Sequence, residues 1–185
     1  MNKPVLYLTV GLPASGKSTY TRQLSALRYS ADAVRGELFG NEGIQYSDDY
    51  LRNLGYDTDS MSDHEKRKTC HHLVWNEVYR RMENSLNQGE DCIADGTFIS
   101  PENRRIVISR FQPFAVIRCL YFRTPADICI ERDSKRSRSV GEPIIRQYEK
   151  NLIPPELSEG FQSIDTIDEN GQRISRAEQT GNSVK

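Results

Sequence analysis

The stretch Gly11–Ser18 constrains this chain most, because its glycines and its lysine suit very few backbone shapes. It reads GLPASGKS and fits the pattern G-x-x-x-x-G-K-[ST]. The apolar, β-branched run 5–10 before it predicts a buried strand, and residues 18–27 after it predict a helix. A glycine-rich loop between a strand and a helix points backbone N–H groups toward an anion. The sequence therefore predicts a loop that cradles the phosphates of a nucleoside triphosphate.

Two glycines and two polar side chains of this loop have distinct expected tasks. Gly11 and Gly16 allow backbone angles and a close approach that a Cβ atom would block. Lys17 is expected to reach the β- and γ-phosphates, and the Ser18 hydroxyl is expected to bind Mg²⁺. A glycine-rich turn without a ligand is the alternative, and it is disfavoured because the pattern agrees with both flanks. The residues of this segment expected to bind ATP are Gly11, Pro13, Ala14, Ser15, Gly16, Lys17, Ser18 and Thr19.

Strand and helix patterns alternate along the rest of the chain. Further strands are predicted over 91–95, 114–122 and 161–167, with a weak one over 27–30. Helices are predicted over 33–39, 63–86, 124–132 and 144–152, and another helix is predicted to begin at 100–102. The helix over 63–86, with Asp63 as its expected cap, has a clear apolar stripe at every fourth residue. Such alternation predicts an α/β fold whose mostly parallel sheet is covered by helices on both faces.

One domain over 1–168 is expected, interrupted by an insert and followed by a tail. Residues 41–62 are polar and acidic, and they predict a long excursion with a single helical turn near 49–54. Residues 169–185 predict a polar C-terminal tail that frays.

Composition narrows the classes of protein that this chain can represent. Its 185 residues carry a net charge of −1, with acids concentrated over 32–65 and bases over 104–146, which argues against strong non-specific binding to nucleic acid. No apolar run reaches about 20 residues, and a strand is expected almost at the N-terminus, so neither a membrane span nor a signal peptide is expected. The four cysteines are widely spaced, which favours free thiols in a reducing cytoplasm.

Chemistry-bearing residues follow several of the predicted strands. In open α/β sheets the ligand lies at the carboxyl ends of the strands, so Gly11, Asp95 and the loop after Phe122 can converge there. Asp95 ends an apolar strand, where nucleotide-binding enzymes place an acid that holds Mg²⁺ or its water; an ordinary turn or capping role is the alternative. Thr97, in the turn that follows, is a candidate for contacting phosphate or substrate.

Asp32 and Arg35 lie one helical turn apart, so their side chains face the same way. A carboxylate near the γ-phosphate can accept the proton of an attacking hydroxyl, and an arginine beside it can grip a phosphate of the acceptor. A simple helix cap at Asp32 is the alternative. Asp32 can join the site if the weak strand over 27–30 forms.

A basic segment precedes the break at 141–143. Arg132, Lys135, Arg136 and Arg138 can form a mobile flap that closes over the phosphates and neutralises charge during transfer. A solvated basic helix end is the alternative.

The segments GLPASGKST, SADAVR, IADGTFISPENRR and RDSKRSRSVGEP occur in this order. In this they resemble P-loop kinases of the polynucleotide 5′-hydroxyl kinase type, over nearly the whole chain to about Asp168. The resemblance implies a P-loop kinase three-layer sandwich with an arginine-bearing lid over 132–143. It also implies ATP and Mg²⁺ as cofactors and transfer of the γ-phosphate to a 5′-OH of DNA or RNA.

On this resemblance, Lys17 and Ser18 (the Walker A residues) look like the ligands of the phosphates and the metal, and Asp95 looks like the acid behind the metal site. Arg132 and Arg136 resemble lid arginines that bind ATP, and Arg136 is the preferred catalytic candidate alongside Lys17.

On the acceptor side, Asp32 looks like the general base and Arg35 like the ligand of the acceptor phosphate. The acidic insert would lie near this side and would repel a nucleic-acid backbone. Two alternatives therefore stay open: a kinase of an antibiotic, a sugar, a nucleoside or a hydroxymethylated base in DNA, and a nucleotide-gated binding module with slow ATP hydrolysis.

Overall fold

The computed structural model describes residues 3–41 and 43–179. Glu42 of the predicted insert and residues 180–185 of the predicted tail lie outside the described part of the chain. The chain divides into two compact units, one formed by Met1–Arg28 with Ser85–Lys185 and the other by Tyr29–Asn84.

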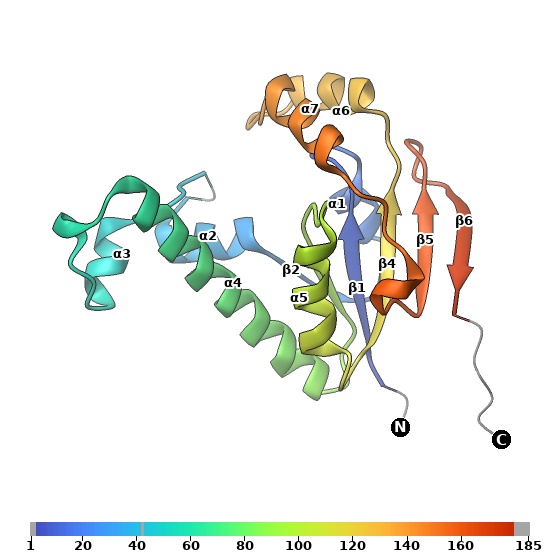
Figure 1. Ribbon diagram of the computed structural model, residues 1–185, viewed down its shortest axis with the longest axis horizontal. Helices are drawn as coiled ribbons and strands as arrows, with labels where there is room; N and C mark the ends of the chain where they lie inside the picture. The colour runs from blue at the N-terminus through green and yellow to red at the C-terminus, as the bar shows by residue number, and fades with distance from the viewer. Residues whose placement is uncertain (1–2, 42, 180–185) are drawn as a thin grey trace. The chain divides into compact units, whose positions relative to one another are not determined.

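A six-stranded sheet forms the centre of the first unit (Figure 1), and its strand order is β2-β3-β1-β4-β5-β6. The strands are β1 (Val5–Val10), β2 (Leu27–Ser30), β3 (Cys92–Asp95), β4 (Val116–Phe122), β5 (Ser163–Ile167) and β6 (Arg173–Glu178). The pairs β1–β3, β1–β4 and β4–β5 are parallel, whereas β6 is antiparallel to β5. Because β1 lies between β3 and β4, the loops that follow these three strands meet at one edge of the sheet.

Helices cover both faces of the sheet, as the alternating pattern predicts. They are α1 (Lys17–Thr21), α5 (Pro101–Phe111), α6 (Ala126–Ser134) and α7 (Glu142–Asn151), with a 3₁₀ turn η2 (Leu157–Glu159). On one face, Tyr20 and Leu24 pack against Leu120, Phe122 and Ile167. Helices α6 and α7 lie at the end of the sheet toward which β1 and β4 run (Figure 1).

Helices α6 and α7 pack against the glycine-rich loop through apolar side chains. Leu12 of that loop packs in one buried cluster with Ala126 and Cys129 of α6 and Ile145 of α7. The predicted lid segment is therefore connected to the predicted phosphate-binding loop through the core of the first unit.

The second unit contains α2 (Ala31–Phe39), α3 (Asp48–Asn53), a 3₁₀ turn η1 (Thr58–Ser60) and most of α4 (Asp63–Asn87). Ser30 caps α2, since its hydroxyl oxygen accepts a hydrogen bond from the Ala33 N–H at 3.1 Å, and Gly40 ends the helix in the left-handed conformation. The predicted apolar stripe of α4 is buried throughout, at Cys70, Val74, Val78, Met82 and Leu86.

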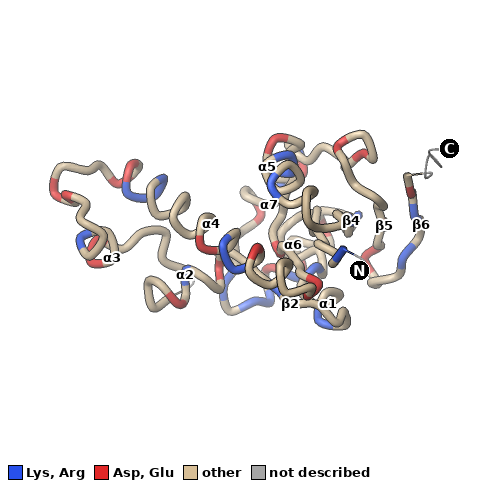
Figure 2. The backbone as a smooth tube through the Cα atoms, turned by 90° about the horizontal axis from the view of Figure 1, so that it is seen from below, with Lys and Arg blue, Asp and Glu red and all other residues tan. Residues whose placement is uncertain are grey.

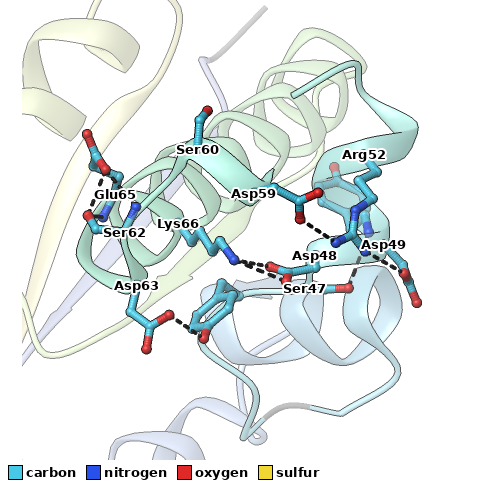
Figure 3. A network of polar contacts seen from close by, with 12 residues as sticks. Ser47, Asp48, Asp49, Arg52, Asp59, Ser60, Ser62, Asp63, Glu65 and Lys66 are labelled. Carbon is cyan, nitrogen blue, oxygen red and sulfur yellow. Dashed lines mark hydrogen bonds and ion pairs between the residues drawn. The ribbon is translucent and has the colours of Figure 1, made fainter. Parts of the chain in front are cut away.

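Charges of the acidic insert are compensated within the second unit. Lys66 pairs with Asp48 at 3.1 Å, and Arg52 pairs with both Asp49 and Asp59 (Figure 3). The Tyr46 hydroxyl donates to Asp63 at 2.9 Å. Figure 2 shows basic as well as acidic segments along α3 and α4. The insert is thus a folded segment whose negative charge is partly compensated by Arg52 and by Lys66 of α4.

Three local predictions are wrong, each because a tertiary constraint or a neighbouring residue prevails. The helix predicted over 18–27 ends at Thr21. Beyond it, backbone hydrogen bonds join residues three apart, as in a 3₁₀ turn, and the chain then returns to the sheet, where the Leu27 N–H donates to the Asp91 carbonyl at 2.8 Å. Ser62, not Asp63, caps α4 by exchanging hydrogen bonds with Glu65. The tail does not fray over Arg173–Glu178, because β6 pairs with β5.

All four cysteines are buried free thiols. None of the helices in residues 3–41 and 43–179 combines the length and the apolar character needed to cross a lipid bilayer.

Candidate active site

The loop after β1 adopts a shape that depends on its glycines. Gly11 has φ +151°, and a Cβ atom there would lie 2.9 Å from both the Cβ and the carbonyl oxygen of Phe122. Gly16 has φ +95°, which is in the left-handed region that favours glycine. Ala14 adopts φ +58° although it has a side chain. The expected need for glycine at positions 11 and 16 is therefore confirmed.

Lys17 begins α1, and its side chain is buried within the loop. Its ammonium donates to the carbonyl oxygens of Gly11 (3.1 Å) and Leu12, and to the Ser15 hydroxyl (3.2 Å). Burial lowers the pKa of this ammonium to about 8, against an opposing effect of the nearby Asp95 carboxylate. The hydrogen bonds of this ammonium thus go to neutral oxygens, which a phosphate anion can replace as partners.

Ser18 and Asp95 come together, although they are 77 positions apart in the sequence. The Ser18 hydroxyl donates to Asp95 Oδ2 at 3.2 Å, and Arg28 Nε lies 3.5 Å from the same oxygen. Both side chains offer the oxygen ligands that Mg²⁺ prefers, and Mg²⁺ commonly takes one or two carboxylates with substrate phosphates and water. In the described ranges 3–41 and 43–179, no group of three or more His, Cys, Asp or Glu could hold a metal ion. The Ser18 hydroxyl and the Asp95 carboxylate are thus two oxygen ligands of a kind that could hold Mg²⁺.

Loops after β3 and β4 are bonded directly to the glycine-rich loop. The Thr97 carbonyl accepts from the Gly11 N–H at 3.0 Å, so this residue contributes its backbone there. The Thr124 hydroxyl donates to the Ser15 carbonyl at 2.9 Å. The sequence analysis did not single out Thr124; its position two residues after a strong strand was the available signal. Of the remaining predicted ATP ligands, Pro13 is half-buried in the loop and Thr19 is exposed in α1.

The two predicted lid arginines differ in how they are held. Arg132 is half-buried and donates to the Glu169 carbonyl at 2.7 Å, and its Nη1 lies 3.8 Å from where a Cβ atom of Gly16 would be. Arg136 is more exposed, 4.0 Å from Asp133 Oδ1, and its charge contributes to the lowered pKa of Lys17. Both guanidinium groups are thus close to the phosphate-binding loop.

Asp133 fixes the segment between α6 and α7, a role that the sequence analysis missed. Its buried Oδ2 accepts hydrogen bonds from the Ser139 hydroxyl (2.6 Å) and from the N–H groups of Val140 (3.0 Å) and Gly141 (2.9 Å). Burial opposes ionisation of this carboxyl, but the hydrogen bonds outweigh burial and hold its pKa below the usual range. The carboxylate thereby closes the loop that carries Arg136.

Asp32 and Arg35 form an ion pair in the first turns of α2, within the second unit. Arg35 Nη1 lies 2.8 Å from Asp32 Oδ1, and Nη2 lies 3.3 Å from Nδ1 of His71 on α4. The arginine side chain is only 10% exposed, whereas the aspartate side chain is 57% exposed. Asp32 therefore offers an accessible carboxylate beside a buried cation. His71 was not expected in this cluster, since its contact with Arg35 depends on how α2 and α4 pack.

Comparison with known proteins agrees with this architecture. A profile of the AAA domain family AAA_33 matches residues 6–155. No curated protein matches the sequence. One similar solved structure belongs to the Pnkp1/Rnl/Hen1 RNA repair complex, with a TM-score of 0.63 and 16% identity; the match covers 100% of this chain and 52% of that one. This chain thus spans about half the length of its relative in the RNA repair complex.

Two other solved structures are matched over most of their length. One is a putative kinase from Chloroflexus aurantiacus J-10-fl, with a TM-score of 0.62, 18% identity and coverage of 90% of this chain and 89% of that one. The other is a sugar kinase from Janibacter sp. HTCC2649, with a TM-score of 0.57, 15% identity and coverage of 91% and 87%. The matched profile and the shared sheet lead to one conclusion: the chain belongs to the AAA domain family AAA_33 and has the fold of the P-loop kinases.

Proposed function

We propose that this protein transfers the γ-phosphate of ATP to a hydroxyl group, with the 5′-OH of a polynucleotide as the preferred acceptor. The observation that carries the ATP-binding part is the Ser18–Asp95 contact of 3.2 Å beside the buried Lys17 ammonium. A hydroxyl, a carboxylate and a lysine in this arrangement are the groups that hold a triphosphate with its metal ion in P-loop proteins.

Each residue of the loop has a definite task in this proposal. Lys17 exchanges its neutral carbonyl partners for phosphate oxygens and stabilises the charge that spreads over the transferred group. Ser18 and Asp95 would hold Mg²⁺, which supplies charge neutralisation at the phosphates when bound. Arg132 and Arg136 approach the transferred phosphoryl group from the segment over 132–143, which is the proposed lid.

The lowered pKa of Lys17 predicts a pH dependence of ATP binding. Free Lys17 loses its proton as the pH rises through about 8, whereas a bound triphosphate favours the charged form and raises this pKa. Binding above pH 8 must then take up a proton, so the affinity for MgATP should fall by up to ~10-fold per pH unit. Calorimetric titration between pH 7 and 9.5 measures this effect. Lys17→Met should bind more weakly at pH 7 and show no such slope; a wild-type affinity that is flat to pH 9.5 would contradict the assignment.

The acceptor side of the proposal rests on the Asp32–Arg35 pair. The exposed Asp32 carboxylate accepts the proton of the attacking hydroxyl, and Arg35 binds a phosphate of the acceptor. Because Arg35 is proposed to bind a phosphate of the acceptor, this proposal favours a nucleic acid over a neutral sugar as the acceptor. Ion pairs within the second unit also reduce the expected repulsion, since Lys66 and Arg52 together balance two of the negative charges of the insert.

Salt separates a polynucleotide acceptor from a neutral one. The dissociation constant of a 3′-labelled, single-stranded 5′-OH oligonucleotide should rise with salt, with a log–log slope of about 0.7 per phosphate contact. Arg35→Gln should lower this slope by about 0.7 and weaken binding, whereas Lys68→Gln, which alters an exposed cation of the same unit, should not. Fluorescence anisotropy between 50 and 200 mM salt measures both. An unchanged slope in the Arg35 variant would remove this residue from the acceptor site.

A small hydroxylated acceptor is the second candidate. It is favoured because the structural match to a sugar kinase covers most of both chains. Transfer of labelled γ-phosphate into a panel of 5′-OH oligonucleotides, nucleosides, sugars and antibiotics distinguishes the two. The proposed cellular location is the reducing cytoplasm, which is consistent with the four buried free thiols.

A further inference from the structure

An aromatic stripe runs along α4 beside the proposed acceptor site. His71, Trp75 and Tyr79 recur at every fourth residue, so they share one face of the helix. The ring centroids of His71 and Trp75 are 6.4 Å apart, and those of Trp75 and Tyr79 are 5.4 Å apart. His71 is exposed, and the other two side chains are half-buried. The stripe therefore borders the core of the second unit and reaches its surface.

One end of this stripe meets the Arg35 guanidinium. Arg35 Nη2 lies 3.3 Å from His71 Nδ1, and Nη1 lies 2.8 Å from Asp32 Oδ1. The Arg35 Nε is buried and has no hydrogen-bond partner among the described residues. A phosphate oxygen can satisfy such a donor. Trp75 follows His71 by one helical turn, about 6 Å along the axis.

Glu77, which follows Trp75 by two residues on α4, is paired with cations. Glu77 accepts from Arg80 Nε at 2.8 Å and from Arg81 Nε at 2.7 Å, and these bonds lower its pKa to about 2. Its charge is thus balanced by two guanidinium groups. A cation for phosphate and flat rings for stacking therefore occur on one face, without an uncompensated carboxylate from Glu77.

We propose that this aromatic stripe binds the nucleobase of the acceptor, with Trp75 as the stacking partner while Arg35 holds a phosphate. This inference rests on the proposed function and specifies its substrate as a nucleotide or polynucleotide with an intact base. Stacking on an aromatic ring tolerates every base, since each has a π-face, so the stripe should bind without strong sequence preference. A sugar or an antibiotic without a planar ring would not use it.

The chain contains a single tryptophan, so its fluorescence reports on this position alone. A 5′-OH single-stranded oligonucleotide is titrated into the wild-type protein, followed at the same salt by an oligonucleotide of equal length whose 5′-terminal nucleotide is abasic. We expect saturable quenching with the first and clearly less with the second. Equal quenching by both would overturn the stacking assignment. This measurement needs no variant and is unaffected by any change in folding.

Steady-state kinetics on variants provide the second readout. Trp75→Leu should raise the acceptor KM by about 5- to 150-fold, with a much smaller change in the KM for ATP. Trp75→Phe should restore most of the affinity, and the abasic acceptor should not distinguish these proteins. Tyr56→Leu, which alters an exposed aromatic ring elsewhere in the second unit, serves as the control.

The outcomes separate this inference from the proposed function. Phosphorylation of oligonucleotides with an acceptor KM that is insensitive to Trp75 would overturn the stacking assignment alone. Absence of transfer to every oligonucleotide, with transfer to a sugar or an antibiotic, would overturn the polynucleotide acceptor and the stripe's role together.

Discussion

Replacing Asp32 by asparagine should lower the rate of phosphoryl transfer by ~10²–10⁴ while MgATP binds as before. The amide keeps the size of the carboxylate and an oxygen that can accept the hydrogen bond from Arg35, at 2.8 Å in this structure. It cannot take the proton of an attacking hydroxyl. The loss should therefore appear in kcat at saturating acceptor, measured by transfer of labelled γ-phosphate, with the affinity for MgATP measured by calorimetry.

A matched acid in the same unit provides the control for this experiment. Asp59 is exposed and paired with Arg52, so Asp59→Asn removes one negative charge from the same unit without changing the proposed general base. It should change kcat by less than about threefold, since exposed ion pairs contribute little. Near-normal transfer by the Asp32 variant, or an equal loss in both variants, would exclude Asp32 as the general base.

The largest expected effect on stability is at Arg104, whose side chain is completely buried. Its guanidinium binds Glu159 through two hydrogen bonds of 2.7 and 2.8 Å and donates to the carbonyl oxygens of Phe98 and Ile153, each at 3.0 Å. One residue thus connects α5 with the loop after β3, the chain after α7 and η2. Arg104→Met should lower the free energy of unfolding by ~3–5 kcal/mol, because it leaves Glu159 and two carbonyl groups without their partner.

Urea unfolding monitored by circular dichroism measures this loss. Arg105→Met changes the next residue of α5, which is exposed, and should alter the free energy of unfolding by less than about 0.5 kcal/mol. A loss below ~1 kcal/mol for Arg104→Met would show that the buried pair is replaceable by apolar packing.

Local sequence rules were sufficient where the determining residues are neighbours in the chain. The glycine-rich loop and the apolar stripe of α4 both depend on spacings of a few residues, and the structure has each of them as predicted. The approach of Ser18 to Asp95 was also accessible, because the carboxyl ends of parallel strands meet at one edge of a sheet.

The features that were not predicted from the sequence depend on contacts between residues that are not neighbours in the chain. Arg104 was counted only among the bases over 104–146, yet its partners Glu159 and Ile153 are about 50 residues away. His71 meets Arg35 only because α2 and α4 pack together. The role of Asp133 depends on a loop that folds back over eight residues, and no helical or strand period reveals such a contact.

Strand β6 bears on whether copies of this molecule associate through their sheets, because it lies at one border of the sheet. It pairs with β5 on one side, and among the described residues no strand lies on its other side, a position at which backbone groups can recruit a strand from another chain. Its side chains are all exposed and include Arg173, Arg176 and Glu178. Figure 2 shows charged segments along β6. Repulsion between like charges and the strong hydration of these groups should discourage edge-to-edge aggregation, so the polar C-terminal strand protects the colloidal stability of the protein.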